Sequence, residues 1–242
     1  MKNILIPSTL QNDTINAVKT AIKSSNGDQC QLILMLLADI PDTFSSASLL
    51  RNINEGLSTT QENVLLMCRQ IILESKNCNL KIHHQYGISS PVFKNIMKHF
   101  AIGLTIITPS FKSSKKKINS FGIQIISNSK CPILHTNANF EEVIFSQALY
   151  IKNSDSSLHA EDLQAYVNTI FSLKIVSETK TSETEPFLTD TISKNNINIL
   201  IETRKPKKLK LLRKEKAALN EMLGLPVLSL YEDISYKNQI IF

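Results

Sequence analysis

Two lysine-rich segments contain the side chains that could contact an anion. Residues 108–120 read TPSFKSSKKKINS and follow an apolar run, with three consecutive lysines at 115–117. A helix is predicted directly after these lysines, and the free N–H groups and dipole at a helix N-terminus attract negative charge. Residues 204–210, RKPKKLK, form a similar basic segment later in the chain. Phosphate is therefore the first ligand chemistry to test against the sequence.

Glycine is scarce in the chain, and its spacing excludes the common phosphate-binding motifs. The 242 residues include 6 glycines, and the closest pair, Gly87 and Gly103, is 16 positions apart. The dinucleotide-binding fingerprint, the P-loop and the kinase glycine loop each need two or three glycines within about seven residues. None of these motifs is present.

Hydrolytic and metal chemistry find little support in the sequence. Ser8, Thr9 and Ser110 carry hydroxyls, but no base or orienting carboxylate stands at a spacing that would pair with them. His83 and His84 are adjacent on an expected strand, so they point to opposite faces and cannot chelate one ion together. We therefore predict no catalytic residue, no metal site and no enzymatic activity, with slow ATP hydrolysis as the alternative.

Positive charge is concentrated in parts of the chain. The formal net charge is +6, and no Asp or Glu occurs between residues 75 and 140. Eight basic residues fall within 204–216, and such a patch attracts phosphates or nucleic acid. No aromatic residue is interleaved to stack on bases, so a solvated basic face is the simpler interpretation. The candidate anion or nucleic-acid patch comprises Arg204, Lys205, Lys207, Lys208, Lys210 and Arg213.

Alternating strands and helices must position these segments. In the first part of the chain, the patterns predict strands at 4–6, 31–38, 80–86, 104–107 and 132–136 and helices at 14–25, 60–74, 91–100 and 118–128. Asp13 or Thr14 is the expected cap of the first helix. This alternation is typical of an α/β fold with a doubly wound, parallel, Rossmann-like sheet.

The second part of the chain repeats this alternation in a shorter form. It predicts strands at 148–152, 173–177, 198–201 and 226–230, and helices at 160–170, 187–193 and 209–223. A shift of 94 positions places residues 105–107 on 199–201 and residues 131–134 on 225–228 without a gap. An internal repeat of this kind favours duplication. We therefore predict two tandem domains, residues 1–139 and a truncated copy at 140–242.

The cysteine spacing and the hydropathy indicate in which cellular compartment the protein is expected. The 4 cysteines show no C-x-x-C spacing, and the longest apolar run, residues 32–38, is far shorter than a membrane span. The N-terminal apolar run ends at Pro7, too early for a signal peptide. These features predict a cytoplasmic protein without a membrane segment.

The first part of the chain resembles the universal stress protein family. The correspondence rests on the start KNILIP at 2–7, the strand at 32–38 and the ending CPIL at 131–134. The second part is similar to a shortened copy that ends in LPVL at 225–228. The resemblance implies that the two units pack as an intramolecular pseudo-dimer, with a homodimer as a further possibility. It also implies a ligand, usually ATP, at the carboxyl ends of the first and fourth strands.

The residues at the family's ATP-binding positions depart from its pattern. Thr9 stands where the family has an acidic residue, and Leu37 lies where it has a backbone contact. The loop at 108–120 contains none of the glycines of the family pattern; only Ser120 agrees, with Asn119 in place of the last glycine. Pro109 removes one N–H donor and fixes its own φ. The expected residual pocket comprises Pro7, Ser8, Thr9, Leu37, Thr108, Ser110, Lys115, Asn119 and Ser120.

The resemblance implies a stress-related, non-catalytic binding or regulatory module, and the departures from the family pattern predict a degenerate nucleotide site. We expect no cofactor and no ATP binding in the usual family mode. One alternative is an ATP, other adenine nucleotide or phosphate ligand held by the lysine-rich loops. Another is weak nucleic-acid binding through residues 204–216. The protein partner is not identified by the sequence.

Overall fold

The computed structural model describes residues 3–25, 27–40, 56–137, 145–153, 156–181, 183–205 and 223–232. The chain divides into two compact units, Met1–Ile126 and Ser127–Phe242. The strand at Ile133–His135 therefore falls in the second unit, whereas the sequence placed it at the end of the first domain. The two units are described in turn.

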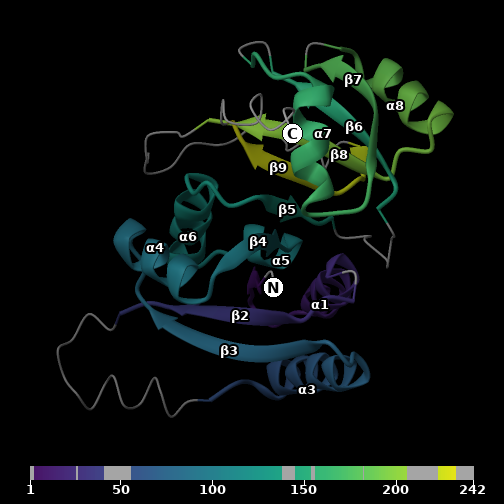
Figure 1. The fold of residues 1–242 in the computed structure, drawn as a ribbon. Coiled ribbons are helices and arrows are strands. Elements are labelled where there is room, and N and C mark those ends of the chain that lie inside the picture. The colour runs from purple at the N-terminus through teal and green to yellow at the C-terminus, as the bar shows by residue number, and fades with distance from the viewer. Residues whose placement is uncertain are drawn as a thin grey trace. The chain divides into compact units, whose positions relative to one another are not determined.

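The first unit is a parallel sheet with helical crossovers (Figure 1). Its strands follow the order β3-β2-β1-β4, and each of these pairings is parallel. The chain runs β1 to β2 to β3 in one direction and then crosses back to β4 on the other side of β1. The elements are β1 (Asn3–Pro7), α1 (Asp13–Ser24), β2 (Cys30–Ala38), α3 (Thr59–Glu74), β3 (Cys78–Tyr86), α4 (Ser90–His99), β4 (Ile102–Ile107), α5 (Pro109–Lys112) and α6 (Lys117–Ser127).

Continuous apolar runs form the central strands of this sheet because both faces are covered. Leu5 in β1 pairs in register with Ile33 in β2, and both side chains are fully buried. Helices α1 and α3 contact each other, and right-handed crossovers put α4 on the opposite face of the sheet. The doubly wound α/β prediction is confirmed, and most element boundaries differ from the predicted ones by one or two residues.

Helix α3 begins at a reciprocal capping box. The Ser58 hydroxyl accepts a hydrogen bond from the Gln61 N–H at 3.3 Å, and the Gln61 Oε1 accepts one from the Ser58 N–H at 3.0 Å. Gln61 also donates from Nε2 to the Thr9 carbonyl at 3.2 Å, which ties the helix to the loop after β1. The cap therefore fixes both the start of α3 and its position beside that loop.

Replacing Ser58 with alanine is expected to lower the free energy of unfolding by about 1 kcal/mol, since the N-cap side chain satisfies an otherwise unpaired helix N–H. Urea unfolding followed by circular dichroism measures the change. Thr60→Ala, in the exposed first turn of the same helix, is the control and should stay within about 0.5 kcal/mol of the parent. Equal effects of the two substitutions would contradict the role of the cap.

The second unit contains a mixed sheet in the order β5-β9-β8-β6-β7. The pairs β6–β7, β6–β8 and β8–β9 are parallel, but β5 and β9 are antiparallel, which departs from the wholly parallel sheet that the sequence predicted. The predicted helix at 209–223 lies almost entirely outside the described residues. The elements are β5 (Ile133–His135), β6 (Gln147–Lys152), α7 (Ala160–Asn168), β7 (Lys174–Lys180), α8 (Glu185–Lys194), β8 (Ile199–Arg204) and β9 (Val227–Tyr231).

A compact apolar cluster supports the second sheet. Leu188 from α8 packs with strand residues from β6, β8 and β9, and the cluster comprises Leu149, Ile151, Leu188, Ile197, Leu200 and Val227. Strand β7 extends to Lys180 and so includes residues that the sequence predicted as a loop after Ser177. Among the described residues, no helix has the length and apolar character needed to cross a lipid bilayer.

Candidate functional site

The topology of the first unit defines the place where a ligand site is expected. Strand order reverses at β1, whose neighbours β2 and β4 are reached by crossovers in opposite directions. Ligands of doubly wound sheets bind at such a switch point, beyond the carboxyl ends of the strands. The segment after β1 and the segment after β4 meet there, and they carry Ser8, Thr9, Thr108 and Ser110.

A carboxylate from α1 occupies the hydrogen-bond donors at the end of β4. Asp13 Oδ2 accepts from the Ser110 backbone N–H at 2.7 Å, and Asp13 Oδ1 accepts from the Ser110 hydroxyl at 2.7 Å. The sequence predicted Asp13 or Thr14 as the cap of its own helix. That prediction is wrong, because Asn12 is the N-cap and it makes no side-chain capping bond. Asp13 instead connects two segments that are 97 residues apart.

The neighbouring hydroxyls bond to one another. The Thr9 hydroxyl donates to Ser110 Oγ at 3.0 Å, and Thr108 Oγ1 lies 3.2 Å from Ser110 Oγ. The Ser8 hydroxyl lies 2.8 Å from Thr14 Oγ1 and accepts from the Leu10 N–H at 2.8 Å. The hydroxyl groups that were predicted to line a pocket therefore lie close together, but they form hydrogen bonds with one another.

Two buried apolar side chains of the first unit pack near Gly122 of α6. The Phe111 side chain is fully buried, and Leu37 at the end of β2 is also buried. A Cβ placed on Gly122 of α6 would lie 2.7 Å from Leu37 Cδ1 and 3.8 Å from Phe111 Cζ. The absence of a side chain at Gly122 thus lets Leu37 and the Phe111 ring pack against α6.

The remaining predicted pocket residues divide between the interior and the surface. Pro7 ends β1 and is buried, and Asn119 is buried with its Nδ2 donating to Ser114 Oγ at 2.8 Å. Lys115 and Ser120 are exposed. The structure therefore brings Thr9, Thr108 and Ser110 together, buries Leu37 near Gly122 of α6, and leaves Lys115 and Ser120 at the surface.

The corresponding end of the second sheet also holds an internal carboxylate. Glu178 Oε2 on β7 accepts from the Ala160 N–H at the start of α7 at 2.9 Å. Its Oε1 lies 3.5 Å from Lys152 Nζ and 3.4 Å from His159 Nδ1. The α7 N-terminus is thus neutralised from within the chain, as the donors at Ser110 are in the first unit.

Comparison with solved structures decides the fold. No family model matches the sequence, and a search of the curated proteins also found no match. The structure is similar to that of a universal stress protein from Archaeoglobus fulgidus, with a TM-score of 0.55 and 11% identity over 96% of this chain and 97% of that one. This chain has the universal stress protein fold.

A second solved structure is similar along nearly the whole chain. It is a functionally unknown protein from Pseudomonas aeruginosa, with a TM-score of 0.50 and 8% identity over 98% of this chain and 95% of that one. At such identities the similarity concerns the fold alone. The universal stress protein fold predicted from the sequence is thereby confirmed.

Arg204 lies in the predicted basic patch, but its guanidinium group is directed into the second unit of this universal stress protein fold. Nε donates to the Ser127 carbonyl at 3.1 Å and Nη2 donates to the Ser129 carbonyl at 3.0 Å. Short hydrogen bonds also join Nη2 to the Cys131 carbonyl and Nη1 to the Ser229 carbonyl. Arg204 therefore connects the segment before β5 to β8 and β9.

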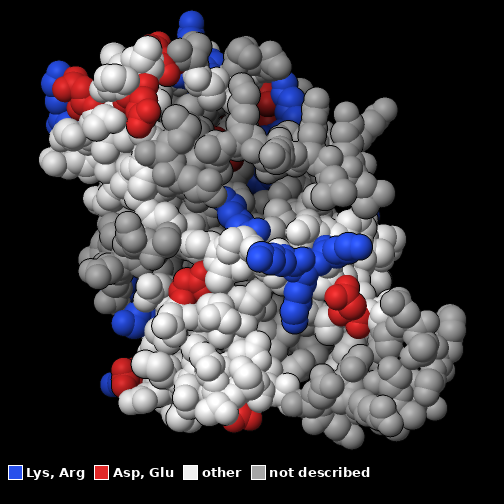
Figure 2. Space-filling model, turned by 180° about the vertical axis from the view of Figure 1, so that it is seen from behind, with Lys and Arg blue, Asp and Glu red and all other residues white. Residues whose placement is uncertain are grey.

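The other members of the patch differ in what the structure describes of them. Lys205 is exposed, and its Nζ lies 3.5 Å from Glu232 Oε2. Lys207, Lys208, Lys210 and Arg213 lie outside the described residues. Figure 2 shows Lys and Arg side chains at the surface of the described residues, with Asp and Glu side chains close to some of them.

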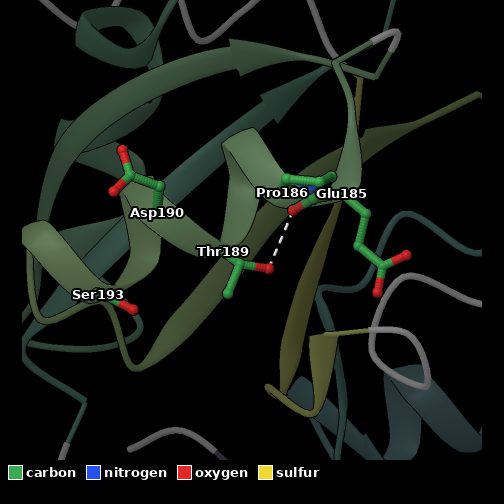
Figure 3. Close-up of a pocket in the computed structure, with 5 residues that line it drawn as sticks. All are labelled: Glu185, Pro186, Thr189, Asp190 and Ser193. Carbon is green, nitrogen blue, oxygen red and sulfur yellow. Dashed lines mark hydrogen bonds between the residues drawn. The ribbon is translucent and has the colours of Figure 1, made fainter.

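A shallow hollow runs along α8, but the polar side chains that line it do not point toward a common ligand position. Glu185, Pro186, Thr189, Asp190 and Ser193 line it, and all five are exposed. The carboxylates of Glu185 and Asp190 point away from each other, and the Thr189 hydroxyl donates to the Glu185 carbonyl of its own helix (Figure 3). Asp190 Oδ2 pairs with Lys194 Nζ at 2.7 Å. Over the part of the chain that the structure describes, no group of three or more His, Cys, Asp and Glu residues could hold a metal ion.

Helix α5 and its contact with Asp13 are the features of this site that the sequence analysis missed. Thr108 is the N-cap of α5 and Pro109 is its first residue. Threonine followed by proline is a typical helix start, so this short helix could have been predicted. The Asp13 contact had no comparable signal, because nothing in the local sequence shows which distant N–H group a carboxylate will meet.

Proposed function

We propose that this chain is a universal stress protein that acts as a non-catalytic binding or regulatory module and does not bind ATP in the usual family mode. The observation that carries the proposal is the pair of 2.7 Å hydrogen bonds from the Ser110 N–H and hydroxyl to the Asp13 carboxylate. A phosphate at the end of β4 would need these donors.

Charge and volume both oppose a nucleotide at this place. The Asp13 carboxylate repels a phosphate, since like charges disfavour each other most strongly where water is partly excluded. Pro109 offers no N–H, and the segment after β4 carries the bulky, buried Phe111 side chain where the family has a glycine loop. Several independent features of the first unit therefore act against the same ligand.

We further propose a cytoplasmic location, consistent with 4 cysteines whose spacing does not suggest a disulfide framework. The proposal includes the tandem arrangement of two related units, the second one shortened, which would pack as an intramolecular pseudo-dimer. It includes no cofactor and no catalytic residue. The exposed lysines at 115–117 support the alternative of an anion held at the surface, which the experiment below distinguishes.

Thermal unfolding of the full chain with ATP, AMP, inorganic phosphate or a short DNA duplex tests the proposal. At about 1 mM, none of the first three is expected to raise the Tm by more than about 1 °C, because a ligand that does not bind the folded state does not stabilise it. A Tm increase of several degrees with ATP would overturn the degenerate-site proposal. If the increase disappeared in a variant with Lys115, Lys116 and Lys117 changed to Gln, the lysine-rich loop would be the ligand site. A DNA-dependent increase that survives moderate salt would instead favour residues 204–216.

Asp13→Asn tests the structural role of the carboxylate independently. This substitution is expected to lower the free energy of unfolding by about 1–2 kcal/mol, because weaker contacts with a neutral amide replace two charge-assisted hydrogen bonds from Ser110. Asp28→Asn is the matched control: Asp28 is exposed in the turn before β2, and its substitution changes the net charge equally. Urea titration compares the two variants. Equal stability of both would contradict the importance of the Asp13 contact.

A further inference from the structure

Two cysteine thiols meet at the amino ends of β2 and β3. Cys30 and Cys78 are direct register partners in these parallel strands, and their Sγ atoms lie 3.1 Å apart. Both side chains are buried, with 1% of Cys30 and 6% of Cys78 exposed. The other two cysteines take no part in this contact: Cys68 is buried on α3, and Cys131 is half-buried in the second unit.

The backbone geometry at this pair suits a disulfide. Register partners in a parallel sheet present their side chains to the same face, and neighbouring strands are about 4.8 Å apart. Disulfides accept Cα separations of about 4.4–6.8 Å, so the strands need not move. The sulfur atoms must approach by about 1 Å, which side-chain rotation provides. The Cys30 N–H donates to the Asn77 carbonyl at 3.0 Å, which holds the two strand ends together.

We propose that Cys30 and Cys78 are a redox-sensitive site that forms an intramolecular disulfide when the protein meets a peroxide. The more exposed Cys78 reacts first: its thiol loses a proton, the thiolate attacks one peroxide oxygen, the O–O bond breaks, and the departing hydroxide takes up a proton, so that a sulfenic acid and water form. The Cys30 sulfur then attacks the sulfenic sulfur, an Sγ–Sγ bond forms, and a second water leaves with the Cys30 proton. Two thiols are oxidised and hydrogen peroxide is reduced to two water molecules.

The surroundings of Cys30 slow the second step of this reaction, the attack on the sulfenic sulfur. Burial, together with the neighbouring Cys78 thiol, raises the pKa of Cys30 to about 12. Cys30 therefore stays a thiol at neutral pH, and the pair is a slow sensor that responds to sustained oxidation. Closure is expected to accelerate as pH rises, by up to about tenfold per unit while the reacting thiolate is a minor species.

The bond would attach the outer strand β3 to β2 at their amino ends. It would join positions 48 residues apart in the sequence. Constraining a loop of this length in the unfolded chain is expected to raise the Tm by about 5–10 °C. The oxidised protein is thus expected to be the more heat-resistant form.

Thiol counting in the full chain tests the proposal. A Cys68→Ser, Cys131→Ser variant keeps only the proposed pair; after treatment with hydrogen peroxide and denaturation, its accessible thiols should fall from two to none. Peptide mass mapping should find residues 30 and 78 in one cross-linked species, two hydrogen atoms lighter than the reduced peptides. Dithiothreitol should restore both thiols and return the Tm to its reduced value.

Three results would overturn the proposal. Both thiols could survive peroxide, they could be lost as sulfinic acids without a cross-link, or the bond could join two chains on a non-reducing gel. A Cys78→Ser change in the same background is the control, and it should abolish the peroxide-dependent rise in Tm. If that control does not fold, thiol counting and mass mapping of the parent variant decide the matter alone.

Discussion

Replacing Phe111 with alanine is expected to lower the free energy of unfolding by about 3–5 kcal/mol, the usual cost of removing a buried aromatic ring. The Phe111 side chain is fully buried, and its ring lies against α6 near the position of Gly122. Its removal leaves a cavity next to α6, near Gly122. The loss should therefore also loosen the segment that joins β4 to α6.

Phe187→Ala is the matched control for this substitution. Phe187 is 49% exposed on α8, so its loss should cost about 1 kcal/mol or less. Phe111→Leu keeps most of the apolar volume and should fall between the two. Urea unfolding followed by far-ultraviolet circular dichroism ranks the three variants. A cost for Phe111→Ala no larger than that for Phe187→Ala would show that the ring does not support the fold.

Arg204→Ala is the second substitution with a large expected effect, a loss of about 3 kcal/mol. One guanidinium group donates to the carbonyls of Ser127, Ser129, Cys131 and Ser229. Hydrogen bonds from a charged donor are worth about 1.5–3 kcal/mol each, but they are not additive, and water reaches part of the site after truncation. The segment before β5 is expected to detach first.

Two variants show whether the guanidinium geometry or the charge matters. Arg204→Lys keeps the charge but has one nitrogen in place of three, so it should recover less than half of the lost stability. Lys205→Ala removes the next basic residue, which is exposed and makes a 3.5 Å ion pair, and should cost about 0.5 kcal/mol or less. Amide hydrogen exchange of β5 and β9 should accelerate only in the Arg204 variants. Full recovery by lysine would show that charge alone is needed.

The fold could be predicted from the sequence because its elements carry strong local signals. The continuous apolar run that forms β2 indicates a strand buried on both faces, and the apolar stripe of α3 repeats with helical spacing. Strands that alternate with helices require crossovers, and right-handed crossovers leave few arrangements of a doubly wound sheet. These are properties of short segments, so one sequence is enough to show them.

The direction of β5 relative to β9 could not be predicted in the same way. Ile133 pairs with Ser229 and His135 with Val227 in an antiparallel arrangement. A short apolar strand that follows a proline packs equally well in either direction. Its orientation depends on partners about 90 residues away, and the sequence of the strand itself does not indicate them.

The candidate site shows the same limit. Glycine scarcity drew attention to the segment at 108–120, but the hydrogen bonds to Ser110 in this segment come from Asp13, which the sequence assigned to its own helix. Arg204 is similar, since counting basic residues cannot distinguish a solvated guanidinium from one that donates to four backbone carbonyls. Composition gives the number of charged side chains, whereas the groups that each of them contacts depend on long-range packing.

The Asp13 carboxylate competes with any diffusing anion for the hydrogen-bond donors of Ser110. A group attached to the same chain and held 2.7 Å from its donor has an effective concentration far above that of any free phosphate compound in solution. A diffusing anion would have to overcome this advantage before making its first contact with Ser110. Under the proposed function we therefore expect Asp13 to keep its contact with Ser110 when the nucleotide supply changes.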